Sequence, residues 1–268
     1  MQESRIKFLE KTHQYLTEDG KELTSVSAFT KKFEGKVDWQ EVARKYAVKQ
    51  TKNGNPMTKK EVLEMWENKR NKTSEIGTLY HNIREQETLS QEKPIFYNVP
   101  CEKKQCDMVG DDKYSIPINH LENNTVYTEL MIYDLEHMIC GQADKVIVTN
   151  NKIHVWDYKT DKEISFYAYS SQWVDPRKMQ PPLSHLDDVN GNHYSIKMSL
   201  YMYMLWRANN GRLKTGDLHI EHIHLKRDED GIPILQDGKP VVLKVEDITL
   251  PFRKREVEAM LKTLNVKK

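Results

Sequence analysis

The sequence predicts an α/β domain with a central mixed β-sheet and α-helices on its flanks. Three β-rich segments with short connections follow one another over residues 125–133, 138–149 and 152–159. After a loop, the apolar segment HYSIKMSLYMYMLWRA is long enough for a helix, and the alternating segment LHIEHIHLK indicates a further strand. Successive strands followed by a helix and a returning strand are typical of a sheet that helices cover.

The amino-terminal part predicts a hairpin and then helices. Residues 6–30 indicate a β-hairpin with Asp19-Gly20 as its turn, followed by a helix that begins in TSVSAFT. Two helices are expected near residues 38–50 and 58–70. The segment between them, TKNGNP, is rich in turn-forming residues.

A third helix is expected over residues 74–87, with Ser74 as its N-cap. Residues 91–124 contain several prolines and few periodic patterns, so they predict an irregular insertion. Near the carboxyl end, GIPILQDGKPVVLKVEDI predicts a hairpin, and a helix is expected near residues 252–264. No composition shift marks a boundary, so we expect residues 1–268 to form a single domain.

Composition limits the class of protein. Hydrophobic residues make up 38% of the chain and charged residues 30%, which is typical of a soluble globular protein. The 41 Lys and Arg residues and 40 Asp and Glu residues give a net charge of +1. Binding of a nucleic acid would therefore depend on a local basic groove rather than on overall charge.

The chain also carries signals about its compartment. It has no apolar run of the length that a membrane helix needs, and its start, MQESRIKFLE, lacks the apolar core of a signal peptide. The three cysteines, Cys101, Cys106 and Cys140, have no spacing typical of a disulfide scaffold or a metal site. We therefore expect ordinary thiols in a reducing cytoplasm.

An acidic pair is predicted at one end of a hairpin. With Asn150-Asn151 as a two-residue turn, Val148 opposes Ile153 and Asp144 opposes Asp157. Strand alternation places both aspartates on the same face as the valines and isoleucine of the hairpin, and Lys159 follows two positions later. Directly opposed carboxylates repel, with Cβ atoms about 5 Å apart, and a divalent cation would convert that repulsion into coordination. Mg²⁺ suits carboxylate oxygens and keeps water for chemistry. The alternative is an exposed acidic pair with Lys159 as its ion-pair partner.

A third carboxylate is expected near this pair. The segment MIYDLEHMICG predicts a hairpin centred on Asp134 to His137, which places Glu129 near Gln142 and on the same face as Asp144. The alternative is that Glu129 is a solvated strand residue.

With Glu129, Asp144, Asp157 and Lys159 in this order, the sequence resembles the PD-(D/E)XK nuclease superfamily, and most closely its RecB-like and phage exonuclease branch. The matching segments are GTLYH at 77–81, CGQAD at 140–144, WDYKT at 156–160 and YSIKMSLY at 194–201, and the opening HQYLTEDGKELTSVS is similar to the hairpin of that branch. The resemblance implies a restriction-endonuclease-like fold for the whole chain.

The resemblance also implies the site residues and the cofactor. Metal ligands would be His81, Asp144, Asp157 and the backbone carbonyl of Tyr158, with Mg²⁺ or Mn²⁺ as the ion. Lys159 would contact the attacking water or the scissile phosphate, and Glu129 would support the metal or its waters. The implied activity is metal-dependent hydrolysis of DNA, most similar to an exonuclease of DNA-end processing or recombination, in a bacterial or phage-infected cell.

Two features depart from the family pattern. Lys197 stands where the family helix has glutamine, four residues before Tyr201, and both side chains are expected to contact DNA. No cysteine follows Cys140, whereas relatives with an iron–sulfur cluster carry a cysteine group near the carboxyl terminus. We therefore expect no iron–sulfur cluster.

The expected partner is DNA, at ends or in single strands, and the basic segments ARKYAVKQTK and ENKRNK are candidate contacts. A homo-oligomer or a recombination partner protein remains open, and no membrane is expected. The main alternative function is a DNA-binding protein that keeps the nuclease fold without cleavage, for which Lys197 is the one favourable feature. A second alternative is a zinc enzyme built on His222 and His224, but the sequence shows no third ligand for them.

Overall fold

The structure, a computed structural model, describes residues 5–110, 112–170 and 176–264. The strands are β1 (Lys7–Leu9), β2 (Gln14–Leu16), β3 (Glu22–Ser25), β4 (Ile95–Phe96), β5 (Val99–Pro100), β6 (Glu102–Lys104), β7 (Asp107–Val109), β8 (Asp112–Tyr114), β9 (Thr125–Asp134), β10 (Ile139–Thr149), β11 (Lys152–Lys159), β12 (Lys214–Leu225), β13 (Leu235–Gln236), β14 (Lys239–Pro240) and β15 (Val242–Leu250). The helices are α1 (Val26–Lys31), α2 (Trp39–Lys52), α3 (Lys59–Ser90), α4 (Asn190–Ala208) and α5 (Lys254–Leu261).

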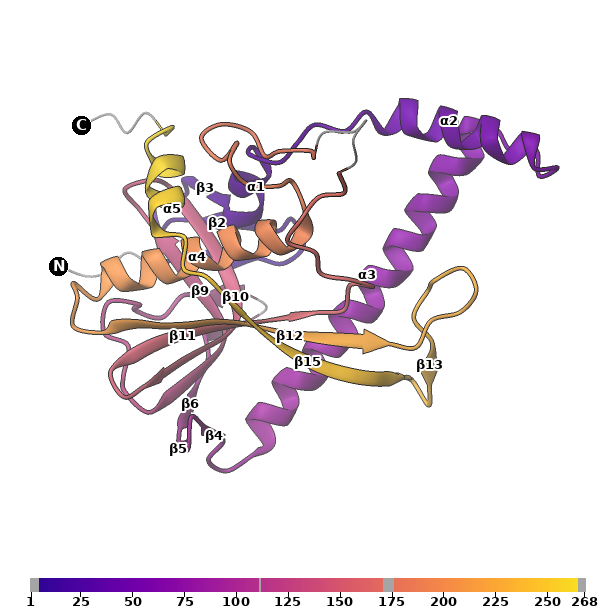
Figure 1. Ribbon diagram of the computed structural model, residues 1–268. Helices are drawn as coiled ribbons and strands as arrows, with labels where there is room; N and C mark the ends of the chain where they lie inside the picture. Colours follow the sequence, from indigo (N-terminus) through magenta and orange to yellow (C-terminus); the bar gives the residue numbers. More distant parts are fainter. Residues whose placement is uncertain (1–4, 111, 171–175, 265–268) are drawn as a thin grey trace.

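The fold is mixed α/β, with a large mixed sheet flanked by helices (Figure 1). Its strand order is β15-β12-β11-β10-β3-β2-β1-β8-β7, and β9 lies against β10 with β6 beyond it. β11 and β12 are parallel, as are β10 and β3, and β6 and β9. The other pairs of this sheet are antiparallel. The α/β class with a central mixed sheet is therefore confirmed.

The hairpin of β10 and β11 has the predicted register. Thr149 pairs with Lys152, Val148 with Ile153, and Val146 with Val155. Asn150 and Asn151 form the turn with φ of 51° and 56°, which Asn tolerates better than most residues.

The hairpin of β9 and β10 is shifted by two residues from the predicted register. Asp134 pairs with Ile139, so the connection covers residues 135–138 rather than Asp134 to His137. The Asp134 carboxylate accepts hydrogen bonds from the backbone N–H groups of Glu136 and His137, which stabilises the turn at this position. The predicted turn was wrong because this side-chain cap, rather than the apolar pattern, determines where the chain reverses.

One long helix replaces two predicted ones. α3 runs without interruption from Lys59 to Ser90, so Ser74 lies inside a helix and is not an N-cap. The helix begins at a capping box in which Thr58 and Glu61 bond each other's backbone N–H groups. The polar segment between the two predicted helices, residues 71–73, contains neither proline nor glycine, so nothing in it stops the helix.

Residues 91–124 are more regular than predicted. They hold the short strands β4 to β8, of which β6 pairs with β9 and β8 pairs with β1. Strands of two or three residues are too short to show an alternating pattern, and their partners are distant in the chain. The sequence patterns missed these strands for this reason.

The carboxyl-terminal segment forms two kinds of pairing. β13 and β14 make the small hairpin, with Asp237 and Gly238 in its turn, while β15 pairs with β12 instead. Helix α5 follows, inside the predicted range. The two long strands β12 and β15 extend together past the rest of the sheet (Figure 1).

The core lies between α4 and the hairpin of β10 and β11. Ile196 and Leu200 of α4 are fully buried in one cluster with Val146 and Val155. Gly141 on β10 allows α4 to come close, because a Cβ there would lie 2.7 Å from the Tyr201 hydroxyl. The face that holds this core is the face on which the aspartates were predicted.

The described helices include none that combines the length and the hydropathy required to cross a bilayer. α2 projects away from the sheet at the end of α3, where Trp39 and Trp66 meet edge to face with ring centroids 6.2 Å apart (Figure 1). Trp39 remains 59% exposed. The contacts between α2 and α3 therefore connect the projecting helix α2 to the rest of the protein.

Candidate active site

The two aspartates lie where the ladder between β10 and β11 ends. The last pair of the ladder is Lys145 with Trp156, and Asp144 and Asp157 occupy the next position on each strand. There the Asp144 carboxylate accepts a hydrogen bond from the backbone N–H of Tyr158, at 2.8 Å. The acidic side chain of β10 therefore replaces a backbone acceptor and reaches across to β11 beside Asp157.

Asp157 is buried and is held by two lysines. Its carboxylate forms an ion pair with Lys159, and Lys197 of α4 lies 3.8 Å from its other oxygen. The Lys197 ammonium also lies 5.7 Å from the centroid of the Tyr201 ring, so the two helix residues expected to contact DNA are neighbours. Lys197 thus faces the acidic pair itself.

His81 reaches the site from α3. Its Nδ1 lies 3.3 Å from Oδ2 of Asp144. Two contacts hold α3 against the sheet near this point: Arg84 pairs with Glu221 of β12 at 2.9 Å, and Tyr80 packs edge to face on Tyr158. Tyr80 and Arg84, one and three residues from His81, therefore hold the helix that carries it in place.

The His81–Asp144 contact changes the pKa of both groups. Burial lowers the pKa of His81, but the hydrogen bond and the charge of Asp144 outweigh it and raise the pKa overall. Burial raises the pKa of Asp144, yet His81, Lys159 and Lys197 together hold it well below its ordinary value. Asp144 is therefore an ionised carboxylate at neutral pH.

Glu129 lies beside Asp144 despite the shifted register. The neighbouring pairs Leu130–Ala143 and Thr128–Lys145 place Glu129 across from Asp144, and its φ of 49° interrupts the regular strand. Its carboxylate accepts a hydrogen bond from the Gln142 amide, so the predicted proximity to Gln142 is present. Burial, and next the charge of Asp144, raise the pKa of Glu129 to about 7.

This raised pKa predicts a pH-dependent stability for the protein in EDTA. A carboxyl group whose pKa is higher in the folded state contributes stability that is complete below its unfolded pKa and is lost as the pH rises through the folded pKa. As the pH rises from about 4.5 to about 7, Glu129 should therefore lower the free energy of unfolding by roughly 1–3 kcal/mol. Urea denaturation at several pH values measures how steeply the free energy of unfolding falls with pH. This slope should be smaller in Glu129→Gln than in wild type, and unchanged in Glu10→Gln, a control at an exposed residue. An equal slope in wild type and Glu129→Gln would contradict the prediction.

The donor set at this point fits a hard divalent cation. Asp144 and Asp157 offer carboxylate oxygens, and the Tyr158 carbonyl, which accepts a hydrogen bond from Lys159 at 3.1 Å, adds a backbone oxygen. Oδ2 of Asp157 is buried and has no hydrogen-bond partner apart from the ion pair with Lys159. His81, Asp144 and Asp157 are not among the groups of described residues whose donor atoms all lie within 4.8 Å of one another. These donor atoms must therefore move closer together than they lie here for all of them to share one ion.

A cleft of about 830 Å³ opens beside His81. It lies between α3 and the loop that follows β12, and Lys69 of α3 approaches Gly231 of that loop closely. Its lining includes the basic residues Lys69, Arg70, Lys162 and Arg227 and the acidic residues Asp161, Glu229 and Asp230. The sequence did not single out Lys162 or Arg227, because only folding brings their loops next to α3.

The predicted basic segments contribute to this cleft unequally. Lys69 and Arg70 of ENKRNK line it, and Arg70 also pairs with Glu67 at 3.6 Å. Arg44 of ARKYAVKQTK does not line it and is paired with Glu41 on the exposed side of α2, with 2.7 Å between Nε and the carboxylate. Exposed pairs of this kind are typical of a solvated helix face. The cleft-lining segment is therefore the better candidate for contact with a partner.

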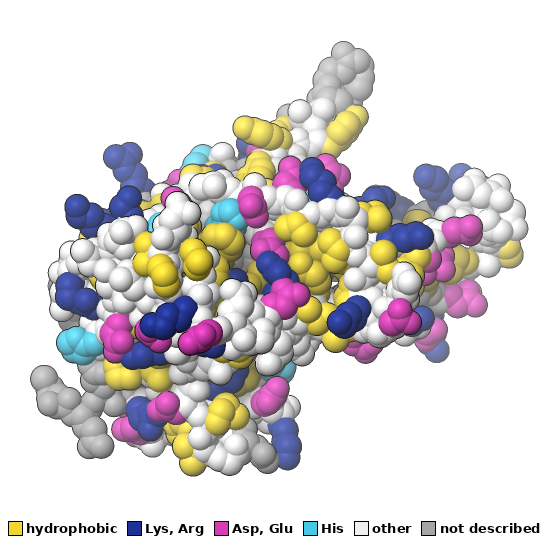
Figure 2. All heavy atoms as spheres, turned by 90° about the horizontal axis from the view of Figure 1, so that it is seen from below, with side chains coloured by type: hydrophobic (Ala, Val, Ile, Leu, Met, Phe, Trp, Pro, Cys, Tyr) yellow, Lys and Arg dark blue, Asp and Glu magenta, His cyan; other side chains and the backbone are white. Residues whose placement is uncertain are grey.

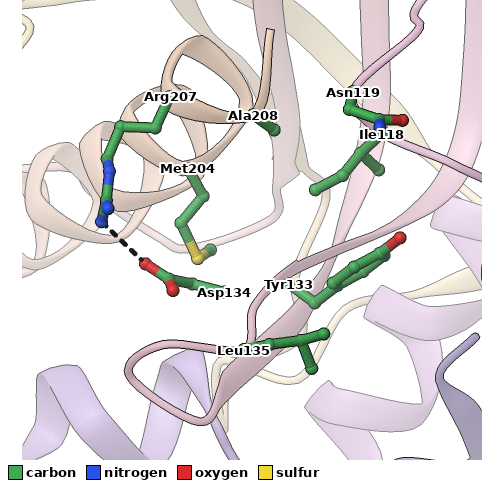
Figure 3. A pocket seen from close by; sticks show the side chains of 8 residues that line it. All are labelled: Ile118, Asn119, Tyr133, Asp134, Leu135, Met204, Arg207 and Ala208. Atoms are coloured by element: carbon green, nitrogen blue, oxygen red, sulfur yellow. Dashed lines mark hydrogen bonds and ion pairs between the residues drawn. The ribbon is translucent and has the colours of Figure 1, made fainter. Parts of the chain in front are cut away.

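A second pocket, of about 340 Å³, lies at the other end of α4 (Figure 3). Met204 and Ala208 line it from the helix, Tyr133 from β9 and Leu135 from the turn after β9. Arg207 spans its edge to Asp134 at 3.2 Å. Its lining residues are different from the predicted site residues.

The comparisons with known proteins leave the family of this chain open. No protein-family model matches the sequence, and no curated protein matches it. The class of protein therefore rests on the geometry of the site and on the order of its residues in the chain.

Proposed function

We propose that this protein is a metal-dependent deoxyribonuclease with a restriction-endonuclease-like core, of the PD-(D/E)XK kind. One observation carries the proposal: the apolar hairpin ends in two adjacent aspartates and a lysine, and a histidine from a separate helix contacts one of the aspartates. Pairs of buried carboxylates at a cleft are costly unless a cation or a proton neutralises them.

His81, Asp144, Asp157 and the Tyr158 carbonyl would hold Mg²⁺ or Mn²⁺. The bound ion would lower the pKa of a coordinated water and stabilise charge on the scissile phosphate. Since Asp144 is ionised at neutral pH, it is ready to act as a ligand without losing a proton.

The protein's own groups orient the reactants. Lys159 carries an ammonium beside Asp157, from where it is suited to position the attacking water or to balance negative charge that develops on the phosphate. Glu129, whose buried carboxyl group lies across from Asp144, is suited to support the ion or its coordinated waters. Lys197 and Tyr201 on α4 present a cation and an aromatic ring next to the same carboxylates, suited to a phosphate and its neighbouring base.

The cleft beside His81 is proposed to bind the DNA backbone. Lys69 and Arg70 line one side and Lys162 and Arg227 the other, so phosphates would contact cations on both walls. Trp66 at the outer end adds an aromatic surface on which an unpaired base can stack. The acidic residues Asp161, Glu229 and Asp230 also line the cleft, so attraction of the backbone would depend on the positions of these four cations rather than on the total charge of the lining. On the face in Figure 2, Lys and Arg side chains are likewise interspersed with Asp and Glu, which agrees with the net charge of +1.

A DNA-binding protein without cleavage is the second candidate. It is favoured by the position of Lys197, which lies 3.8 Å from Asp157 and partly neutralises the carboxylate that would hold the ion. Both candidates predict binding of DNA, and they differ in turnover.

A cleavage assay decides between the two candidates. End-labelled linear duplex, end-blocked duplex and closed circular DNA are incubated with the purified protein and Mg²⁺ or Mn²⁺. We expect linear DNA to be degraded from its ends with either ion, and EDTA to abolish the reaction because the carboxylates then lack their cation. DNA binding without cleavage under all ion conditions would reject the nuclease and favour the second candidate.

A further inference from the structure

A second group of metal-binding side chains lies on the pair of strands β12 and β15. His222 and His224 are two residues apart on β12, and Glu246 on β15 is directly across from His222. Each of the three offers one ligand atom, and these atoms all lie within 4.8 Å of one another. The third ligand that the sequence lacked is therefore supplied by a strand about twenty residues further along the chain.

The orientation of His222 prepares one ring nitrogen as a ligand. Its Nε2 lies 2.9 Å from the backbone carbonyl oxygen of Asp161. A carbonyl only accepts hydrogen bonds, so Nε2 carries the proton and Nδ1 keeps a free lone pair. A carbonyl that fixes the tautomer of a histidine in this way is the usual second partner of a metal-binding imidazole.

The other two members complete the group from the solvent side. The ring of His224 lies 4.2 Å from that of His222, and its Nε2 lies 3.1 Å from Oε2 of Glu246. His222 is only 3% exposed, whereas the side chains of His224 and Glu246 are 32% and 45% exposed. One side of the group is thus rigid and buried, and the other is open to water.

We propose that His222, His224 and Glu246 bind one transition-metal ion of the Zn²⁺ class, with the fourth position open to solvent. Two imidazoles and one carboxylate are the donor set that such an ion prefers, and Mg²⁺, which prefers oxygen ligands, does not compete well for it. Tetrahedral coordination at about 2.1 Å needs ligand atoms about 3.4 Å apart, so atoms that now lie within 4.8 Å of one another need to approach by at most about 1.4 Å.

Lys244 competes with a metal ion for one of the three ligands. Its ammonium lies 3.4 Å from the same Glu246 oxygen and competes with an ion for that carboxylate. The comparable cluster of Asp134, Glu136 and His137 differs, because Arg207 already pairs with both of its carboxylates. The Lys244 side chain is 63% exposed, so it can turn into solvent at little cost. A metal ion would therefore displace Lys244 from the Glu246 carboxylate.

This group lies next to the candidate active site, but metal binding by it does not require that site to be active. His222 is the register partner of Lys159 on β11, and its hydrogen-bond acceptor, Asp161, lies two residues after Lys159. A bound ion would join β12 to β15 next to the strand end that carries the catalytic lysine. Since ligands that bind only the folded state raise the unfolding temperature, this site should stabilise the protein whether or not it cleaves DNA.

Zinc binding by the full-length, EDTA-stripped protein tests the proposal. Zn²⁺ is titrated in competition with a chromophoric chelator, Co²⁺ absorption reports the coordination geometry, and the unfolding temperature is measured with and without Zn²⁺. We expect one high-affinity equivalent, at least a tenfold loss of affinity in His224→Ala and in Glu246→Gln, and a gain in unfolding temperature with Zn²⁺ that these variants lack.

Two controls separate the proposed site from other zinc ligands. Asp247→Asn removes the partner of His219, a similar exposed cross-strand pair with 3.0 Å between Nε2 and Oδ1 on the same two strands, and should bind zinc like wild type. Asp157→Asn should also keep the high-affinity equivalent. The proposal is overturned if the wild type binds no zinc, if His224→Ala and Glu246→Gln bind it like wild type, or if Asp157→Asn alone loses it. None of these readouts requires DNA cleavage, so a failure here is distinct from a failure of the nuclease proposal.

Discussion

Asp157→Asn is expected to lower the rate of DNA cleavage by at least about 1000-fold, which corresponds to roughly 4 kcal/mol of lost transition-state stabilisation. The substitution keeps the size of the side chain and removes its charge. Asp157 is a proposed ligand, and its carboxylate also orients Lys159 and lies near Lys197. Cleavage should fall because the affinity for Mn²⁺ falls, and calorimetric titration of Mn²⁺ measures that second quantity directly.

Stability must be measured beside activity for this variant. Removal of a buried charge leaves Lys159 without its partner, which is expected to cost about 1–3 kcal/mol of unfolding free energy and to leave the protein folded. Asp217→Asn is the matched control, since Asp217 pairs with His154 nearer the other end of the sheet strands and its side chain is half exposed. Wild-type cleavage by Asp157→Asn, or equal losses in both variants, would refute the assignment of Asp157.

Lys159→Met is expected to reduce the rate roughly 100- to 1000-fold while Mn²⁺ affinity is retained or increased. Methionine keeps the apolar part of the side chain and removes the ammonium. Since that ammonium forms an ion pair with Asp157, its loss frees a carboxylate oxygen for the ion and at the same time removes the positive charge proposed to act on water or phosphate. Loss of activity with undiminished metal binding is the signature that distinguishes Lys159 from the proposed ligands.

Lys152→Met provides the control for this variant. Lys152 is exposed at the opposite end of the same strand, so its removal changes the net charge equally without touching the site. Single-turnover cleavage at saturating Mn²⁺ separates the chemical step from metal binding. A Lys159→Met protein that cleaves like Lys152→Met would show that Lys159 has only a structural role.

Local patterns were sufficient for the hairpin at the centre of the site. The Asn150-Asn151 turn and the alternation of valine and isoleucine on each side define one register, and a slip by one residue would have exposed the whole apolar face. The same reasoning failed one hairpin earlier, where the Asp134 side chain caps the turn and moves the register by two residues. Side-chain caps of this kind act locally but are invisible to the apolar pattern.

The sequence by itself determined the α/β class, the face and register of the Asp144–Asp157 hairpin, and the order of the acidic residues and lysine in the chain. Periodicity and turn chemistry act over a few residues, so they can be read without knowledge of the fold. Only the tertiary structure decided that His81 contacts Asp144, that Lys197 faces Asp157, and that Glu246 joins His222 and His224. These contacts join residues that are distant in the chain, and they form because burial of the sheet face against α4 and the crossing of α3 bring their elements together.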